Sequence, residues 1–453
     1  MTIDTQIAAK LLQEQETICA ADTWRQVTEY GGTFAAEFTV LACQILVYKL
    51  AARYLGTLGF GEYAVARRMI SLLQPIVLLG IGVGLPRYIA MAEASGDLYR
   101  VRRFFGAAVW CIGAAVGVVA IALVIWQDWF SYLFFGNKAY ANVLPALAFA
   151  LVGLSIHGVC YALFRGRMVI ARANWLNLLN LGFVPVIVLT WCHRSTVAVL
   201  WGLALGWASV ALIALAWTPI SAAFRNHPLE RKELLTYGLQ RVPGDFILMA
   251  LLAVPAIFAA HASGIQIAGY VAFGVSLTSM IASMFSPVGV ILLPKVSANV
   301  KNGMIAKMRK EIRLIGWSAV LIPLALIVAV EVLTPLLIRF YLGGEFESAA
   351  RIVRILIIAA LPLSVYYALR SVLDGFHDRA VNTINLSFSI LAFLALSSAA
   401  YFWRGRIDMT LWSFVLATAL LAILTTLDVR KILRRGIAPS FDLPFSCDES
   451  LDR

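Results

Sequence analysis

Charged residues are scarce in this sequence. Asp, Glu, Lys and Arg make up only 14% of the 453 residues, whereas 61% are hydrophobic. A soluble globular protein carries roughly a quarter of its residues as charged side chains, so this composition excludes a single soluble globule. Because a helix satisfies its backbone hydrogen bonds within one segment that can cross hydrocarbon, the composition predicts an all-α polytopic membrane protein.

The sequence also lacks the patterns of metal and redox sites. Its six cysteines form no CxxC pair, and His157 stands outside any HxxxH or HExxH motif. The outer loops are short, and they carry no nucleophile–base constellation. We therefore expect no catalytic residue, no metal and no cofactor. A membrane polysaccharide polymerase or ligase is disfavoured but stays an alternative.

What the chain does have is a series of long apolar runs. We count about twelve, and each is long enough for a helix to cross ~30 Å of hydrocarbon. Their approximate bounds are 33–52, 69–90, 104–126, 142–164, 173–191, 196–217, 237–260, 266–293, 314–338, 351–369, 382–403 and 409–427.

The net charge of +12 raises the question of nucleic-acid binding. However, the basic residues are scattered over the short segments between the apolar runs, with no folded domain to present them, so we expect no nucleic-acid partner. Most of them fall on the side that holds the N-terminus. The positive-inside rule then predicts a multi-pass protein with both termini in the cytoplasm.

The chain contains two copies of one unit. Gly59-Phe60-Gly61-Glu62-Tyr63, which we interpret as an aromatic–glycine turn, opens an apolar run that ends near Pro86. Gly269-Tyr270 opens a similar run that ends near Pro294, and basic residues follow both. The repeat predicts two pseudo-symmetric six-helix bundles around a central cavity. The predicted segments are an N-terminal cytoplasmic segment (1–32), an N-terminal bundle (33–217), a cytoplasmic linker (218–236), a C-terminal bundle (237–427) and a cytoplasmic tail (428–453).

The stretch GFGEYAVARRMISLLQPIVLLGIGVGLPRYIA resembles the second helix of the polysaccharide (O-antigen or exopolysaccharide) flippases. These belong to the multidrug/oligosaccharidyl-lipid/polysaccharide exporter superfamily. The resemblance implies a V-shaped pair of bundles in the bacterial inner membrane that moves undecaprenyl-diphosphate-linked oligosaccharide to the outer leaflet. Its implied partners are that substrate, membrane lipids and polysaccharide polymerase or assembly proteins. Two extra C-terminal helices, expected of peptidoglycan-precursor flippases, are missing from the pattern, and the doublet Arg67-Arg68 matches no family motif.

Two carboxylates lie at matched places in the first helix of each half, Glu37 and Asp245. Ionisable residues inside spans are costly and by default functional, so both are candidates for coupling transport to a proton or sodium gradient. The alternative is a buried partner for a nearby base, such as Arg241 one turn from Asp245.

Basic residues in or beside the spans are candidates for binding the diphosphate. Arginines three apart share one helix face and suit phosphate oxygens, whereas adjacent arginines point about 100° apart. The alternatives are snorkelling to the membrane surface and ordinary positive-inside anchoring. The candidates are Arg351 and Arg354, Arg67 and Arg68, Arg87, and Lys49.

A multidrug or cation antiporter of the same superfamily is the main alternative function. A site that exports cations should be dominated by acids, yet arginines outnumber acids in these spans. This balance favours an anionic substrate.

Overall fold

The computed structural model describes residues 3–219, 221, 225, 227–285, 305–376, 381–404 and 407–435. Within these ranges the chain is helical and contains no strand, so the predicted all-α fold class is confirmed. The end of the second repeat copy, with Pro287, Pro294 and Lys295, lies outside the described residues. The helices of the first part are α1 (Ile3–Leu78), α2 (Ile81–Ala94), α3 (Leu98–Ile125), α4 (Gln127–Phe135), η1 (Lys138–Val143), α5 (Leu144–Gly166), α6 (Ile170–Asn177), η2 (Leu178–Phe183), α7 (Val184–Trp191), α8 (Thr196–Ala216), α9 (Pro228–Leu239), α10 (Val242–Ser263) and α11 (Ile265–Ser283). The later ones are α13 (Ile305–Leu337), η4 (Ile338–Leu342), η5 (Gly344–Phe346), α14 (Ala349–Ile357), α15 (Ala360–Phe376), α16 (Val381–Arg404) and α17 (Ile407–Arg435).

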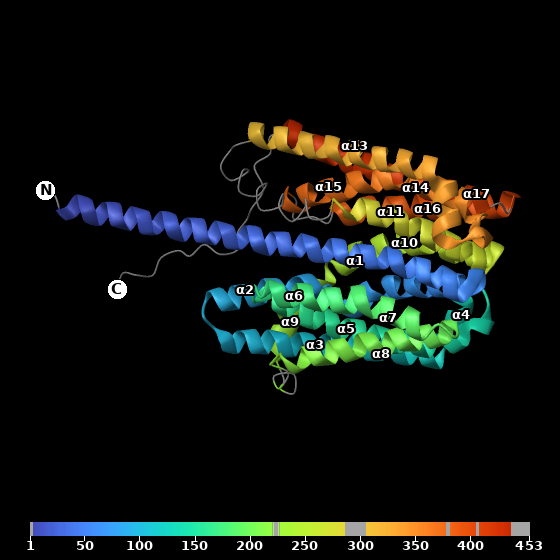
Figure 1. Cartoon of the computed structure of the whole chain (residues 1–453), viewed down its shortest axis with the longest axis horizontal. Helices are drawn as coiled ribbons and strands as arrows, with labels where there is room; N and C mark the ends of the chain where they lie inside the picture. Colours follow the sequence, from blue (N-terminus) through green and yellow to red (C-terminus); the bar gives the residue numbers. More distant parts are fainter. Residues whose placement is uncertain are drawn as a thin grey trace. The chain divides into compact units, whose positions relative to one another are not determined.

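Helix α1 consists of two arms that run back along each other (Figure 1). Gly56 has φ 64° and ψ −172°, a backbone conformation that favours glycine. Beyond it, the guanidinium of Arg67 lies 2.5 Å from the amide oxygen of Gln44. These residues are 23 positions apart in sequence, and on an uninterrupted helix that separation would place them about 35 Å apart. The chain therefore reverses at Gly56, and we call residues 3–55 the first arm and 57–78 the second arm.

This reversal corrects the predicted turn at Gly59–Tyr63, because those residues are helical in the second arm. It also accounts for the span count. Eleven helices in the described residues are long and apolar enough to cross a membrane, and the first of them, Gly31–Leu78, contains the second arm and the later part of the first. The second arm and α2 are separated by a break at Leu79 and Gly80, whose φ values are 50° and 67°.

The described chain forms two compact units. One comprises residues 1–273 and 336–349, and the other comprises residues 274–335 and 350–453. In the first unit, α5 packs between α3 and α8 and also contacts α2 (Figure 1). Local capping helps to start these helices, because the side chain of Asp97 accepts from the Arg100 backbone N–H and Ser195 does the same for Ala198.

In the second unit, α15, α16 and α17 pack against one another. Val372 and Leu373 of α15 are buried with Val429 and Ile432 of α17. The Ser389 hydroxyl of α16 donates to a backbone carbonyl of α17, a small-residue contact typical of helices packed within a membrane. The division into five predicted segments stays a prediction.

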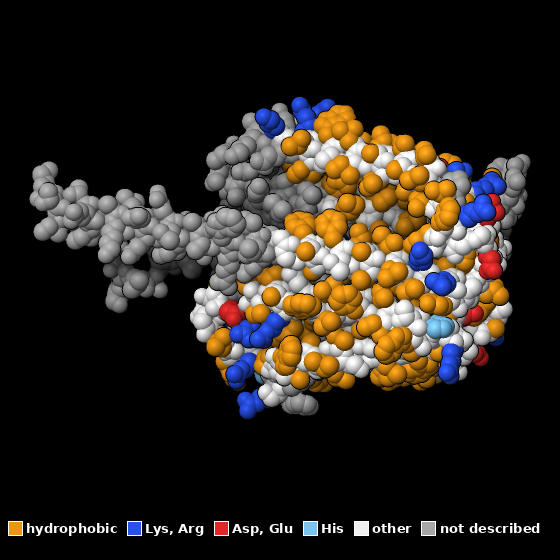
Figure 2. All heavy atoms as spheres, in the orientation of Figure 1, with side chains coloured by type: hydrophobic (Ala, Val, Ile, Leu, Met, Phe, Trp, Pro, Cys, Tyr) orange, Lys and Arg blue, Asp and Glu red, His pale blue; other side chains and the backbone are white. Residues whose placement is uncertain are grey.

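Each unit exposes large hydrophobic side chains on the sides of its helices. Val118, Ile121 and Ile125 share a face of α3, and each is more than half exposed, whereas Phe105 and Ala108 of the same helix are fully buried. Figure 2 shows hydrophobic side chains covering the helix flanks, with most of the visible charged side chains near helix ends. This distribution fits helices whose exposed faces meet lipid.

Candidate functional site

Arg67 of the second arm is held by neutral groups. Its Nη2 donates to Gln44 Oε1 at 2.5 Å, and its Nη1 lies 3.4 Å from the Tyr63 hydroxyl. The guanidinium carbon is 5.6 Å from the ring centre of Tyr48 and 5.9 Å from that of Tyr63. Among the residues that the structure describes, no carboxylate pairs with Arg67. Within the described part of the chain, the site therefore presents a half-buried positive charge without an acidic partner.

Arg68, its neighbour, is buried and donates to the backbone carbonyl of Ala272 on α11, at 3.0 Å. Next to this bond the two repeat copies touch through glycine. A methyl group on Gly269 would overlap the backbone of Gly61, and one on Gly61 would overlap the Ile265 carbonyl. Arg68 therefore joins the second arm to α11, and the two adjacent arginines have different surroundings.

A polar stripe runs along the first arm of α1. Glu37 Oε1 accepts from the amide of Asn177 at 3.4 Å, and the Thr33 hydroxyl accepts from Asn174 at 3.2 Å. Two turns further along the first arm, Gln44 Nε2 donates to the backbone carbonyl of Leu181 at 3.1 Å. Because residues 33, 37 and 44 lie on one helix face, the stripe pairs the first arm with α6 and the π-helical turn η2.

The other carboxylate candidate, Asp245, is half-buried in the first turn of α10, where its backbone N–H bonds the Arg241 carbonyl. Asp245 also has a further interaction within the protein. Elsewhere in the first unit, His157 of α5 is 5% exposed and stacks on Tyr161, with the ring centres 5.9 Å apart.

In the second unit, both arginines of the predicted α14 pair form ion pairs. Arg351 Nη2 lies 2.7 Å from Asp408 at the start of α17, and Arg354 Nε lies 3.4 Å from Glu331 of α13. Their side chains are 72% and 45% exposed. Each guanidinium thus already has an anionic partner, and the phosphate-binding role of this pair stays a prediction.

The two remaining cation candidates lie on exposed surfaces of the first unit. Lys49 is exposed on the first arm. Arg87 is exposed on α2, with its guanidinium 5.0 Å from the ring centre of Tyr237 on α9. Both positions are compatible with the snorkelling and anchoring alternatives.

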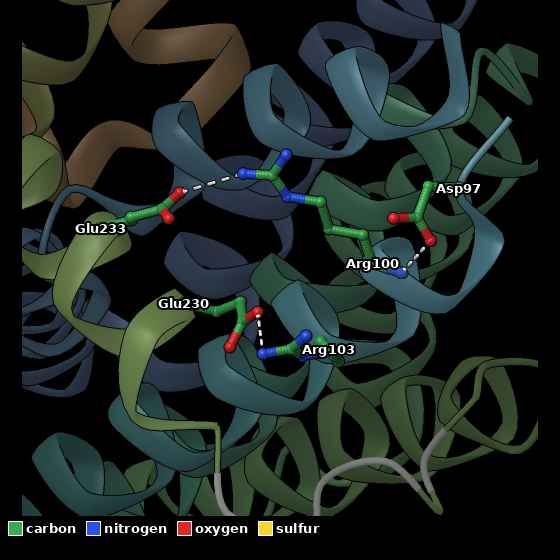
Figure 3. A network of polar contacts seen from close by, with 5 residues as sticks. All are labelled: Asp97, Arg100, Arg103, Glu230 and Glu233. Atoms are coloured by element: carbon green, nitrogen blue, oxygen red, sulfur yellow. Dashed lines mark hydrogen bonds and ion pairs between the residues drawn. The ribbon is translucent and has the colours of Figure 1, made fainter. Parts of the chain in front are cut away.

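Helix α9, in the predicted linker, is attached to α3 by two ion pairs (Figure 3). Arg103 Nη2 lies 2.6 Å from Glu230, which is 4% exposed, and Arg100 Nη2 lies 3.6 Å from the exposed Glu233. The charged run in the linker is therefore one side of a helix–helix contact rather than a solvated stretch.

Sequence reasoning overlooked Gln44 and Asn177. Uncharged amides in an apolar run attract less attention than arginines or carboxylates. One signal was available, because Thr33, Glu37 and Gln44 recur at positions i, i+4 and i+11 of the first span.

The model of one protein family, described as "Polysaccharide biosynthesis protein", matches residues 33–300 of this chain. The chain belongs to that family. No curated protein sequence matches this chain. The predicted membership is thus confirmed, and the match covers residues 33–78 of α1 together with α2 to α11.

Solved structures of transporters share the fold. An inward-facing multidrug resistance MATE family transporter of the MOP superfamily aligns with a TM-score of 0.72 at 14% identity, over 88% of this chain and 95% of that one. The lipid II flippase MurJ in an inward closed conformation aligns with a TM-score of 0.64 at 14% identity, over 89% of each chain. A eukaryotic MATE transporter, AtDTX14, gives a TM-score of 0.58 at 13% identity, over 90% of this chain and all of the other. This chain is therefore a multi-pass membrane protein with the fold of these MOP transporters.

Proposed function

We propose that this protein is a flippase that moves lipid-diphosphate-linked oligosaccharide of the undecaprenyl type from the inner to the outer leaflet of the bacterial inner membrane. The product would serve surface polysaccharide assembly. Membership of the polysaccharide biosynthesis family and the transporter fold support this class of function. The observation that carries the substrate assignment is the guanidinium of Arg67, whose hydrogen-bond partners among the described residues are neutral.

A lipid diphosphate needs such a group when its headgroup leaves water. An isolated anion in an apolar medium costs tens of kcal/mol, so a path through the bilayer must supply cations or hydrogen-bond donors. Arginine presents five donors in a planar fork that matches phosphate oxygens. Gln44 and Tyr63 accept from two of the nitrogens of Arg67, so neutral groups engage part of the guanidinium. We propose that its remaining donors bind the diphosphate.

Ion coupling is the second part of the proposal. Glu37 is exposed at the start of the polar stripe and bonded only weakly, at 3.4 Å, to a neutral amide. A carboxylate with a neutral partner can take up and release a proton or sodium ion without breaking an ion pair. We propose that Glu37 and Asp245 exchange such an ion as the protein alternates between inward and outward access.

The deciding experiment removes the protein from its host and restores it as wild type, Arg67→Ala or Arg351→Ala. We expect lipid-linked oligosaccharide to accumulate on the inner leaflet without the protein. Arg67→Ala should leave that accumulation uncorrected, whereas Arg351→Ala, whose guanidinium is already paired, should correct most of it. Altered drug tolerance with a normal surface glycan would instead identify a multidrug or cation antiporter.

A further inference from the structure

We infer that Gln44 is a positioning residue that fixes the orientation of the Arg67 guanidinium by tying it to the π-helical turn η2. The inference rests on the proposed function, because it explains how Arg67 is kept ready for an anionic headgroup. Gln44 itself need not touch the substrate.

The two ends of the Gln44 amide have opposite partners. Its oxygen accepts from Arg67, which can only donate, and its NH₂ group donates to the Leu181 carbonyl, which can only accept. An amide between such partners has one favourable orientation. Gln44 therefore links the Arg67 guanidinium to the backbone of η2, because the Gln44 Nε2 lies 3.1 Å from the Leu181 carbonyl oxygen.

The anchor is an unusual turn. In η2 the Val184 N–H bonds the Leu179 carbonyl, five residues back instead of four. Such π-helical turns are rare and occur frequently at functional sites. The same turn holds Asn180, which is fully buried while both polar atoms of its amide lack a hydrogen-bond partner among the described residues. A buried amide in this state is uncommon in native proteins.

Helix η2 packs along α1. A methyl group placed on Gly182 would lie at ordinary van der Waals distance from side chains of the first arm, 3.6 Å from the Cys43 sulfur and 3.7 Å from Val40. The turn therefore faces the same stretch of the first arm that carries Gln44. Movement of η2 along α1 would be passed through one amide to Arg67.

Positioning matters because arginine is long and flexible. Holding a rotamer-rich side chain in advance lowers the ordering cost of binding, which for one side chain corresponds to roughly a five- to tenfold change in affinity. Loss of Gln44 should therefore weaken binding of an anionic ligand by about this factor. The positive charge itself would remain.

The test uses the full-length protein in detergent and measures equilibrium binding of undecaprenyl diphosphate at neutral pH. Gln44→Ala should bind roughly five- to tenfold more weakly than wild type. Gln44→Glu keeps the length and the acceptor but adds a charge that neutralises Arg67, so its affinity should fall as far as that of Arg67→Ala. Gln266→Ala is the matched control, because that half-buried glutamine donates to the Tyr270 hydroxyl at 2.8 Å and, within the described ranges, is not bonded to a cation. It should bind like wild type.

The outcomes separate this inference from the proposed function. Weak binding by Arg67→Ala with wild-type affinity in both Gln44 variants overturns the positioning role and leaves the proposed function intact. Wild-type affinity in Arg67→Ala refutes the substrate role of Arg67, and the positioning role with it. If Gln44→Ala loses its cooperative unfolding transition, Gln44→Met decides, because methionine keeps the length of the side chain but adds no charge and cannot bridge Arg67 to Leu181. Reduced affinity in that folded variant supports the inference, and unchanged affinity overturns it.

Discussion

The ion pair between Arg103 and Glu230 offers the sharpest test of how the first unit is held together. Glu230 is 4% exposed, and its second carboxylate oxygen is buried without a partner, so Arg103 is its one acidic–basic contact among the described residues. Arg103→Met removes the charge and keeps most of the side-chain stem. The substitution would leave a carboxylate buried without a counter-charge between α9 and α3.

Arg103→Met should lower the free energy of unfolding by a large amount for a single substitution. Breaking a buried ion pair by removing one partner typically destabilises a protein by about 3–5 kcal/mol, whereas an exposed pair contributes about 0–1 kcal/mol. Because the Arg103 side chain is itself 32% exposed, the loss on Arg103→Met should lie toward the lower end of the range for buried pairs. The neighbouring pair, Arg100 and Glu233, provides the exposed case, with side chains 49% and 42% exposed. Arg100→Met should therefore change the free energy of unfolding by no more than about 1 kcal/mol.

The measurement is equilibrium unfolding of the purified protein in mixed micelles, followed by circular dichroism. The double variant Arg103→Met/Glu230→Gln removes both charges and should recover most of the loss, giving a coupling energy well above that of the Arg100–Glu233 cycle. Equal effects of Arg103→Met and Arg100→Met would refute the reasoning, because burial would then make no difference. An uncorrected loss in the double variant would show that packing of the arginine stem, not the charge, holds α9.

Two further predictions concern the glycine contact and the carboxylates. Gly61→Ala should yield little monodisperse protein in size-exclusion chromatography, because its methyl would overlap a backbone carbonyl, whereas Gly113→Ala, with open space around it, should match wild type; equal yields would contradict the close approach. Glu37→Gln and Asp245→Asn should each remove the effect of an imposed proton or sodium gradient on transport in vesicles without lowering expression. Wild-type gradient dependence in both would end their coupling role.

The spans and the fold class could be predicted from sequence because length and hydropathy act on each segment separately. The turn between the first two spans could not. Gly56, Gly59 and Gly61 lie within six residues, and any of them can adopt a positive φ. Contacts far along the chain decide among them, since Gly59 packs against Thr196 and Gly61 against Ile265, which leaves Gly56 for the reversal.

The candidate site was predictable only as a set of residue types. The doublet Arg67-Arg68 stands out in the sequence, but the bond from Arg68 to α11 joins residues about two hundred positions apart. Likewise, nothing near Arg351 in sequence indicates that Asp408 will neutralise it. Whether an arginine has an acidic partner depends on tertiary packing, whereas sequence patterns record local spacing only.

The difference between Arg67 and Arg351 decides where an anion would bind first. An anion that approaches Arg351 competes with a carboxylate 2.7 Å from the guanidinium, and its coulombic gain is reduced by the attraction that it replaces. At Arg67 the partners are an amide and a hydroxyl, which hold the guanidinium while leaving its full charge to the ligand. The neutral partners therefore orient the guanidinium without offsetting its positive charge. For the same reason a single carboxylate introduced at position 44 should reduce anion binding more than the loss of Arg351.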